Sequence, residues 1–311
     1  MIRQKQIILS TLCIFALVLP IVCCSNASVS GTDYGAGDST DSIMFDGLER
    51  TYYIHIPSSH DKTKPMPLVF VLHGAGDSGR KMAWLTRYGF NKLSGRDGFI
   101  VVYPDAIGEK WDQENIDDVG FISALIDHLV KKLNIDERRV YVTGMSNGAF
   151  MTNLLACELS GKIAAIAPVS GTMAKEFVPY CSPSRPISVL IIHGDKDKIV
   201  PWKGGELPVI RLKILSVEET VDHWVTHNNC SSSSIITWEP DRYPQDGTRV
   251  RREVYGQGNE GTEVILYAIE GGGHTWPGGH QLLPILAFGR VCKDINACEV
   301  IWEFFKGRSI K

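Results

Sequence analysis

The sequence has no excess of charge of either sign. Its 311 residues include 32 Lys and Arg against 35 Asp and Glu, which gives a formal net charge of -3. The densest basic run, Arg249–Arg252, is interrupted by Val250. We interpret it as the solvated face of a strand, and a chain without a basic field is not expected to bind nucleic acid.

The sequence also lacks the patterns that hold metals or phosphates. No two cysteines have Cys-x-x-Cys spacing, and the 9 histidines form no compact ligand cluster, so no metal site is expected. The glycine-rich stretch His73–Gly76 is not followed by a Gly-Lys-Ser/Thr element, which argues against a phosphate-binding loop. We therefore expect neither a metal nor an organic cofactor.

The first residues have the order of an export signal. Two basic residues precede the apolar stretch Ile7–Cys24, so we interpret residues 1–27 as a signal peptide. Two processing sites stay open. Cleavage after Ala27 would release a secreted protein, whereas cleavage before Cys24 would leave a lipid on that cysteine and anchor the protein at the cell surface. A membrane is expected as a partner only through such a lipid.

The rest of the chain divides into a short polar segment and one domain. Residues 28–45 are rich in Ser, Gly, Asp and Thr, which is typical of a flexible tether. Residues 46–311 belong to a chain that is 44% hydrophobic and 22% charged. Their number and composition predict a single catalytic domain with a large core.

Five cysteines follow the signal segment. They are Cys157, Cys181, Cys230, Cys292 and Cys298. Because an exported chain favours disulfides, we expect Cys157 to pair with Cys181 and Cys292 with Cys298. Each pair closes a short loop, and Cys230 is left as the odd thiol.

Strand-like and helix-like patterns alternate along the domain. The expected strands are residues 51–56, 68–72, 99–103, 140–143, 163–167, 189–192 and 264–269. The expected helices are residues 81–94, 119–133, 147–159, 217–228 and 297–305. Several strands are almost wholly apolar, which indicates burial on both faces of a mostly parallel sheet. The alternation predicts an α/β fold of three layers, with functional groups at the carboxyl ends of the strands.

The pentapeptide Gly144–Gly148 reads Gly-Met-Ser-Asn-Gly and lies between an expected strand and an expected helix. The pattern alone is weak, but this position is typical of a nucleophile elbow. Ser146 would lie on the tight turn with its hydroxyl exposed. The first amides of the following helix would face developing negative charge.

A nucleophilic serine also needs a base and a carboxylate that orients the base. His274 follows the strand 264–269 and three glycines. Asp195 and Asp197 both follow the strand 189–192. We choose Asp197 because it lies further along the loop, and we expect Asp195 to shape the turn through backbone hydrogen bonds. The order serine, acid, histidine is that of the α/β-hydrolases.

Two amides are candidates for the oxyanion hole. One is the N–H of Asn147, directly after the serine, and the other is the N–H of Ala75 in the loop His73–Gly76. Trp276, just after the histidine, and Trp202, beyond the acid turn, are candidates for substrate binding at the pocket mouth. Aromatic rings there could stack on a substrate ring, or they could be core residues.

Four segments together resemble the polyhydroxybutyrate-depolymerase-like esterase family of secreted α/β-hydrolases, which includes feruloyl esterases and lipoprotein esterases. The segments are His73–Gly76, Gly144–Gly148, His193–Asp197 and Gly272–Gly278. The resemblance runs from about residue 46 to residue 305. It implies an α/β-hydrolase fold, secretion, and hydrolysis of carboxylic esters by Ser146, Asp197 and His274.

The leading interpretation is therefore a secreted serine esterase that acts through an acyl-enzyme. Its substrate would be a small-molecule or polysaccharide-linked ester, such as a feruloyl or acetyl group on plant polysaccharide. A polyhydroxyalkanoate is the alternative substrate. We see no appended substrate-binding domain, which disfavours solid polyester. A peptidase shares the same triad, and a non-catalytic surface-binding module would need none of its three residues.

Overall fold

The computed structural model describes residues 34–207, 210–281 and 284–311. The predicted signal peptide, with both processing sites, lies outside these residues. Among the residues that are described, no helix combines the length and the apolar character needed to cross a membrane.

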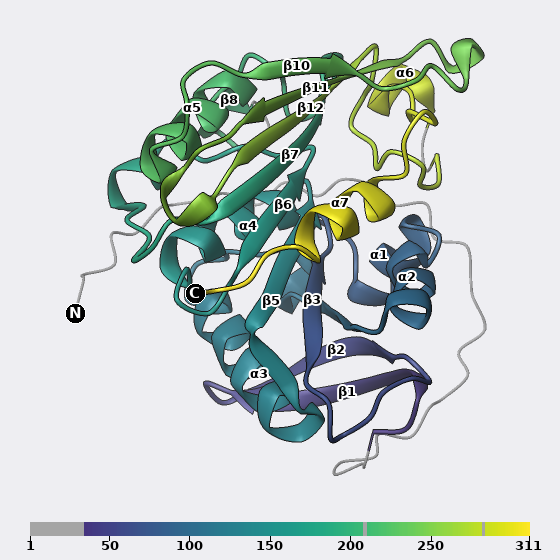
Figure 1. The fold of residues 1–311 in the computed structure, drawn as a ribbon, viewed down its shortest axis with the longest axis vertical. Helices are drawn as coiled ribbons and strands as arrows, with labels where there is room; N and C mark the ends of the chain where they lie inside the picture. Colours follow the sequence, from purple (N-terminus) through teal and green to yellow (C-terminus); the bar gives the residue numbers. More distant parts are fainter. Residues whose placement is uncertain (1–33, 208–209, 282–283) are drawn as a thin grey trace.

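Ten strands form one sheet in the order β1-β2-β4-β3-β5-β6-β7-β12-β11-β10 (Figure 1). The six central strands, from β4 to β12, run parallel. The edge strands are antiparallel. The bounds are β1 Gly37–Phe45, β2 Leu48–Ile56, β3 Met66–Leu72, β4 Ile100–Pro104, β5 Ile135–Met145, β6 Ala165–Val169, β7 Ser188–Gly194, β10 Ile235–Trp238, β11 Arg249–Tyr255 and β12 Val264–Glu270. A separate hairpin pairs β8 (Gly205–Leu207) with β9 (Leu212–Ile214).

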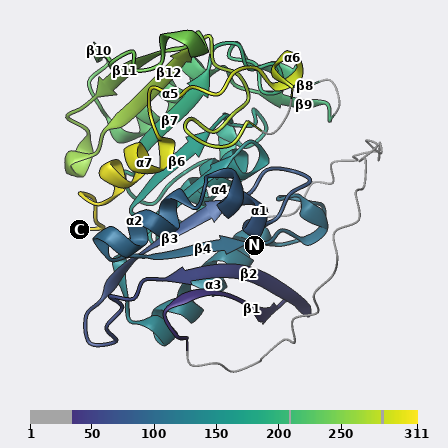
Figure 2. The same cartoon turned by 90° about the vertical axis from the view of Figure 1, so that its right-hand side faces the viewer.

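Helices cover both faces of the sheet (Figure 2). One face packs against α3 (Asp118–Leu133), α4 (Asn147–Glu158) and α5 (Val217–Asn228). The other packs against α1 (Gly79–Leu85), α2 (Gly89–Asp97) and α7 (Ala297–Phe305). The short helix α6 (Ile285–Phe288) lies in the segment after β12. The predicted three-layer α/β fold is confirmed.

The central strands supply both cores because their side chains alternate between the faces. Every residue of β3 is buried. Leu68, Phe70 and Leu72 lie in the core under α3 and α4, whereas Val69 and Val71 lie in the core under α1 and α2. A continuous apolar run is what a parallel strand needs when helices cover both of its faces.

The predicted single helix over residues 81–94 is wrong, because the chain forms two helices there. Arg87 and Tyr88, between α1 and α2, have positive φ angles of 57° and 54°. The hydroxyl of Thr86 donates to two carbonyl oxygens of the last turn of α1. A side chain that bonds the backbone in this way competes with continuation of the helix.

The predicted flexible tether, residues 28–45, is wrong for its last nine residues. Residues 37–45 form β1, which pairs with β2 along its whole length. The turn between them is made by Asp46 and Gly47, with φ angles of 49° and 74°. Two successive positive φ angles favour an Asp-Gly hairpin turn. That dipeptide is the sequence signal that could have located the strand.

The basic run Arg249–Arg252 lies on β11, as the interpretation of a strand face predicts. Val250 is wholly buried. Arg251 lies partly exposed beside it and forms ion pairs with Glu253 and Glu270. The charge of Arg251 is therefore neutralised locally within the sheet.

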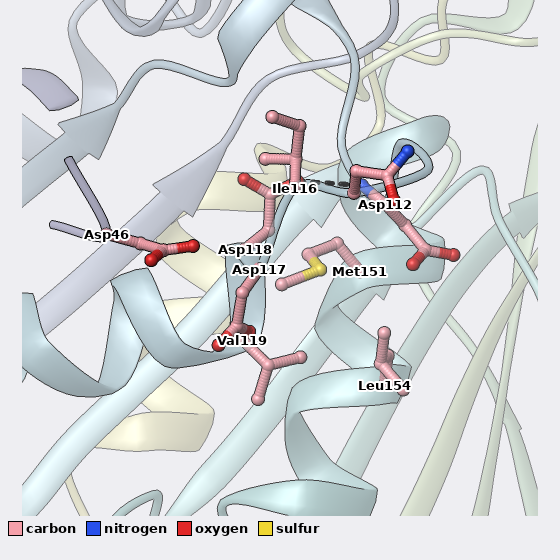
Figure 3. A pocket seen from close by; sticks show the side chains of 9 residues that line it. Asp46, Asp112, Ile116, Asp117, Asp118, Val119, Met151 and Leu154 are labelled. Atoms are coloured by element: carbon pink, nitrogen blue, oxygen red, sulfur yellow. Dashed lines mark hydrogen bonds between the residues drawn. The ribbon is translucent and has the colours of Figure 1, made fainter. Parts of the chain in front are cut away.

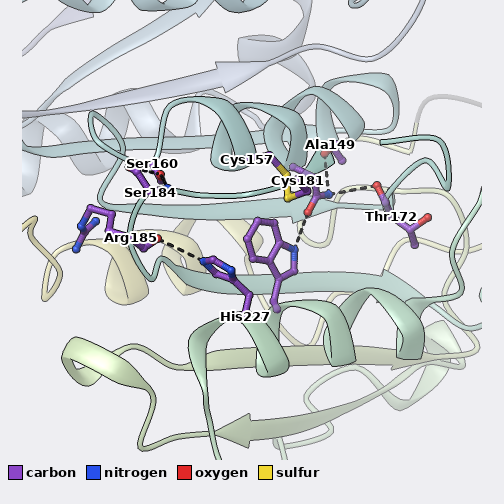
Figure 4. The surroundings of a disulfide bond; sticks show 10 residues. Ala149, Cys157, Ser160, Thr172, Cys181, Ser184, Arg185 and His227 are labelled. Atoms are coloured by element: carbon purple, nitrogen blue, oxygen red, sulfur yellow. Dashed lines mark hydrogen bonds between the residues drawn. A yellow bond between two sulfur atoms is a disulfide. The ribbon is translucent and has the colours of Figure 1, made fainter. Parts of the chain in front are cut away.

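The disulfide expected between Cys157 and Cys181 is confirmed (Figure 4). It ties the last turn of α4 to the segment that follows β6. Cys230 is a free thiol, also as expected. The helix α4 is therefore covalently anchored near its C-terminal end.

The disulfide expected between Cys292 and Cys298 is wrong, because both are buried free thiols. The side chain of Asn296 caps α7 by accepting a hydrogen bond from the N–H of Cys298. The Cys298 thiol then points at α2, where a Cβ added to Gly89 would lie 2.7 Å from its sulfur. The short spacing in sequence therefore does not bring the two sulfurs together.

Candidate active site

Ser146 lies on a strained turn between β5 and α4. Its φ and ψ are 57° and -118°, a conformation that costs energy for a residue with a side chain and that recurs at functional sites. Glycines allow the close approach around it. A Cβ on Gly144 would lie 2.5 Å from the carbonyl oxygen of Gly148, and one on Gly148 would lie 2.5 Å from that of Leu72. This is the geometry of a nucleophile elbow.

Asp197 and His274 lie together at the carboxyl ends of β7 and β12, which are neighbours in the sheet. The distance from Nδ1 of His274 to Oδ2 of Asp197 is 2.8 Å, and the two residues are only 7% and 5% exposed. A carboxylate accepts, so Nδ1 carries the proton and Nε2 is left free to act as a base.

The backbone of the acid turn distinguishes the two aspartates. Oδ1 of Asp197 accepts the N–H groups of Ile199 and Val200, both at 2.8 Å, which leaves Oδ2 for the imidazole. Asp195 instead accepts the N–H of Gly271 at 2.7 Å. The structure thus brings Asp197 to His274 and gives Asp195 a backbone contact that shapes the turn.

The end of β6 connects the serine to the histidine. The N–H of Ser146 donates to Val169 at 3.0 Å. The hydroxyl of the next residue, Ser170, donates to the carbonyl oxygen of Thr275 at 3.2 Å. Because β5, β6, β7 and β12 are adjacent, Ser146, Asp197 and His274 share one edge of the sheet.

His193 lies fully buried beneath this edge, and the sequence analysis gave it no role. Its Nε2 lies 2.8 Å from the carbonyl oxygen of Val200 and 3.6 Å from Oδ2 of Asp197. Burial lowers the pKa of His193 below its usual value, which favours the neutral ring. A neutral Nε2–H that donates to Val200 supports the acid turn without taking a carboxylate oxygen away from His274.

The histidine is covered from outside by the segment around α6. The N–H of His274 donates to the carbonyl oxygen of Phe288 at 2.6 Å, and the two rings lie 6.4 Å apart. Leu286 and Ile285 in the same helix are 86% and 55% exposed. We call Ile285 and Leu286, which lie three and two residues before Phe288 in the chain, the apolar border.

The two candidate oxyanion amides lie on the other side of the serine. Asn147 is the first residue of α4, so its N–H has no partner within the helix. Gly74 lies beside the nucleophile, since a Cβ added to it would be 3.5 Å from the Cβ of Ser146. Ala75, the next residue, is exposed. The geometry places both amides within the neighbourhood of the serine.

Trp111 contacts both of these segments and was missed by the sequence analysis. Its indole Nε1 donates to the carbonyl oxygen of His73 at 2.9 Å. Its backbone N–H donates to Oδ1 of Asn147 at 2.7 Å. Trp111 lies in an irregular loop after β4, where no periodic pattern indicates burial, so the sequence offered no signal beyond the residue type itself.

The two tryptophans expected at the pocket mouth differ in outcome. Trp276 is only 1% exposed and packs against Phe90 in the core under α2. The expectation that it contacts substrate is therefore wrong. Trp202 is partly exposed and its indole donates to Glu218 at 2.6 Å, so its ring lies beside the acid turn and stays a candidate.

A cavity of about 390 Å³ lies next to the elbow but not on the triad (Figure 3). Met151 and Leu154 of α4 form one side, and the start of α3 with its preceding loop forms the other. Four aspartates line it, namely Asp46, Asp112, Asp117 and Asp118. Among the described residues no cluster suited to a metal ion is found.

The parallel sheet, the elbow after β5 and the acid–histidine pair after β7 and β12 define an α/β-hydrolase. Residues 50–183 match the family described as Esterase PHB depolymerase. Feruloyl esterase C of Emericella nidulans is 30% identical over 82% of this chain and 83% of its own length. The chain belongs to this esterase family and is a carboxylic ester hydrolase.

Two further proteins that resemble this chain are also named as esterases. Feruloyl esterase B of Piromyces equi is 30% identical over 73% of this chain, which spans 42% of that longer protein. The solved structure of acetyl xylan esterase from Aspergillus awamori covers 76% of this chain and 94% of its own with a TM-score of 0.54. At 18% identity, that likeness supports the fold.

Proposed function

We propose that this protein is a serine esterase in which Ser146 is the nucleophile, His274 the base and Asp197 the residue that orients the base. The observation that carries the proposal is the 2.8 Å contact between Nδ1 of His274 and Asp197 at the sheet edge that also holds the strained elbow. It leaves Nε2 as the one ring nitrogen able to accept the serine proton.

The reaction follows from this arrangement. Nε2 of His274 takes the proton of the Ser146 hydroxyl as Oγ attacks the ester carbonyl. The carbonyl oxygen becomes an oxyanion that the N–H groups of Ala75 and Asn147 stabilise. The alkoxide leaves with the proton from Nε2, and the acyl group stays on Oγ. Water, deprotonated by the same nitrogen, then releases the carboxylic acid and restores the serine.

We propose feruloyl or acetyl esters of plant polysaccharide as substrates. The names of the relatives at 30% identity support the feruloyl ester, and the apolar border at Leu286 and Ile285 suits a substrate with an aromatic acyl group. Polyhydroxyalkanoate esters are the second candidate, favoured by the description of the matching family.

We propose that the enzyme works outside the cytoplasm. The disulfide between Cys157 and Cys181 supports this, because such bonds persist in oxidising compartments. Release after Ala27 and anchoring through a lipid on Cys24 are distinguished by mass spectrometry of the mature protein, since diacylglyceryl modification adds a defined mass to an N-terminal cysteine.

The chemical proposal is tested by labelling the mature protein with a fluorophosphonate and assaying p-nitrophenyl butyrate. Wild type should label and hydrolyse, and Ser146→Ala should lose both, with kcat lower by about 10⁴-fold or more. Ser184→Ala is the control, because this serine lies near the disulfide and its hydroxyl contacts the hydroxyl of Ser160 at 3.0 Å (Figure 4). Full labelling of Ser146→Ala would overturn the proposal.

The substrate class is tested separately on the active protein. Initial rates with methyl ferulate, acetylated xylan and hydroxybutyrate oligomers should rank the feruloyl or acetyl esters above the oligomers. A higher kcat/KM for the oligomers would assign the polyester function instead.

A further inference from the structure

Trp111 links the two backbone segments that hold the proposed oxyanion amides. It lies in the loop between β4 and α3 and is wholly buried. Three features of its surroundings indicate its role. They are its hydrogen bonds with Asn147, the contacts of the neighbouring His73, and the anchoring of the loop that contains Trp111.

The first feature is a reciprocal pair of hydrogen bonds with Asn147. The backbone N–H of Trp111 donates to Oδ1 of Asn147 at 2.7 Å, and Nδ2 of Asn147 donates back to the carbonyl oxygen of Trp111 at 3.4 Å. Asn147 is the residue whose own N–H faces the proposed oxyanion. Fixing its side chain at both ends restricts rotation of the first residue of α4.

The second feature concerns the peptide group between Gly74 and Ala75. Nδ1 of His73 lies 2.7 Å from the carbonyl oxygen of Gly74. In a planar trans peptide the C=O and the N–H point in opposite directions. A bond that holds the Gly74 oxygen toward His73 therefore directs the Ala75 N–H away from it, so the imidazole sets the direction of the second oxyanion donor.

The protonation state of His73 is determined by its two partners. Nδ1 faces a carbonyl oxygen, which only accepts, so Nδ1 is the donor. Nε2 accepts the backbone N–H of Ala106 at 3.1 Å. This is the neutral tautomer, and burial lowers the pKa of His73 in agreement with it. A neutral ring places no extra cation beside the oxyanion site.

Trp111 in turn holds His73. The indole N–H donates to the carbonyl oxygen of His73 at 2.9 Å, and the two rings lie 5.1 Å apart. Both side chains are wholly buried. The His73 ring and its backbone are thus restrained from the same side.

The loop of Trp111 is itself tied to the scaffold. The N–H of Asp112 donates to Oδ2 of Asp118 at 2.8 Å, and the other oxygen of Asp118 forms a buried ion pair with Arg50 of β2. The restraint on Trp111 therefore extends to β2 and to the first turn of α3.

We propose that Trp111, His73 and Asn147 form an oxyanion clamp, in which Trp111 is a positioning residue that holds the Ala75 and Asn147 amides in one orientation. The inference rests on the proposed function, since it assigns a role to donors of that reaction. In this role Trp111 acts through His73 and Asn147, to which it is bonded. It acts by keeping both donors aligned at the moment when negative charge develops.

The test compares Trp111→Phe with Trp224→Phe. Each variant keeps an aromatic ring and loses one buried indole hydrogen bond, because Nε1 of Trp224 in α5 donates to Oδ1 of Asn153 at 3.0 Å. Trp111→Phe should lower kcat for p-nitrophenyl butyrate by about 10- to 100-fold with KM changed less than about threefold. Trp224→Phe should leave kcat within about twofold.

A tetrahedral inhibitor gives a second readout that general loosening would not move. A phenylboronic acid forms an adduct with the serine whose oxygen occupies the oxyanion site, so its Ki should rise with Trp111→Phe in parallel with the fall in kcat/KM. Thermal unfolding of both variants measures the structural loss, which should be similar for the two.

Three outcomes would overturn the clamp. They are an unchanged kcat in folded Trp111→Phe, an equal fall in kcat for both tryptophan variants, or a loss confined to KM. These outcomes differ from failure of the proposed function, in which the wild type does not label at Ser146 at all. A double-mutant cycle with Asn147→Ala should show less than additive loss, since both changes break the same unit.

Discussion

The oxyanion clamp and the histidine side of the site differ in how their side chains are covered. By the histidine side of the site we mean Asp197, His274 and the helix α6. In the clamp, Trp111 and His73 are wholly buried and bonded on several sides. On the histidine side, Asp197 and His274 are buried but Leu286, in the nearby helix α6, is 86% exposed.

This difference follows from what each side has to do. An oxyanion donor must be in place before charge develops, because reorganising it would cost part of the stabilisation. The apolar border of Ile285 and Leu286 would contact the variable part of different esters and needs no such fixed geometry. Binding preferences commonly vary in surface segments of this kind. We therefore expect changes in the clamp to alter kcat and changes in α6 to alter the preference among esters.

The largest effect is expected on the histidine side, from Asp197→Asn. An amide at this position would no longer fix the Nδ1–H tautomer, and kcat should fall by about 10⁴-fold. Asp195→Asn is the matched control and should lower kcat less than about tenfold, because Asp195 contacts the backbone of Gly271. Steady-state kinetics of both variants measure the difference. If Asp195→Asn is the more damaging change, the assignment of the acid is reversed.

The next effect concerns the elbow helix, which the disulfide anchors at its far end. Replacing Cys157 and Cys181 together by Ser should lower the free energy of unfolding by about 3 kcal/mol, the loss expected for a loop of this size. The sequence separation is 24 residues. Urea unfolding measures the loss. Cys230→Ser is the control and should change stability by less than about 0.5 kcal/mol. Equal losses in the two variants would contradict the anchoring role.

A smaller effect, expected on both sides of the site, is the pH dependence of stability. Burial lowers the pKa of His73 in the clamp and of His193 beneath the acid turn. The unfolded chain takes up protons near pH 6.5, whereas the folded chain does not until lower pH, so stability should fall as the pH drops below about 6.5. Each histidine contributes a slope of up to about 1.4 kcal/mol per pH unit.

Urea midpoints at several pH values between 7.5 and 5 measure that slope. His73→Gln and His193→Gln should each flatten the slope, whatever they do to stability at neutral pH. Flattening by one variant alone would show that only one of the two rings stays neutral in the folded protein, and so would sharpen the comparison between the sides.

The smallest effect is expected at the exposed border. Leu286→Ser should leave kcat for methyl ferulate unchanged and should lower the ratio of kcat/KM for methyl ferulate to that for p-nitrophenyl acetate by about two- to fivefold, since a largely exposed leucine gains only part of its burial energy from an aromatic acyl group. Leu48→Ser, an exposed leucine in the β1–β2 hairpin, is the control. An equal change in both variants would remove α6 from the binding site.

Much of the fold was predictable because its central strands are continuous apolar runs. The helices at residues 217–228 and 297–305 were located at their observed bounds, since capping residues and helical spacing agree there. The strand at 37–45 was missed because its first six residues are glycine or polar and none of its residues is fully buried. Its stability comes from pairing with β2, which local composition does not reveal.

The candidate site also contains residues that the sequence located correctly at the sheet edge and residues that it misplaced. Ser146, Asp197 and His274 were identified because each follows an apolar strand, and parallel strands end at one edge of a sheet. Trp276 was misplaced because position next to the histidine says nothing of which way the indole points. The Cys292–Cys298 pair was misplaced because the cap of α7 turns one thiol toward α2.

The sequence by itself determined the class of fold, the elbow and the order of serine, acid and histidine, because these depend on strand periodicity and local turn chemistry. The choice of Asp197 over Asp195 came from its position in the loop, and the tertiary structure added its contact with the imidazole. Only the tertiary structure decided that Trp111 bonds to both His73 and Asn147, and that Ile285 and Leu286 are exposed in the segment that contacts His274. Those contacts join residues far apart in the chain, and their geometry depends on how the layers pack rather than on any local pattern.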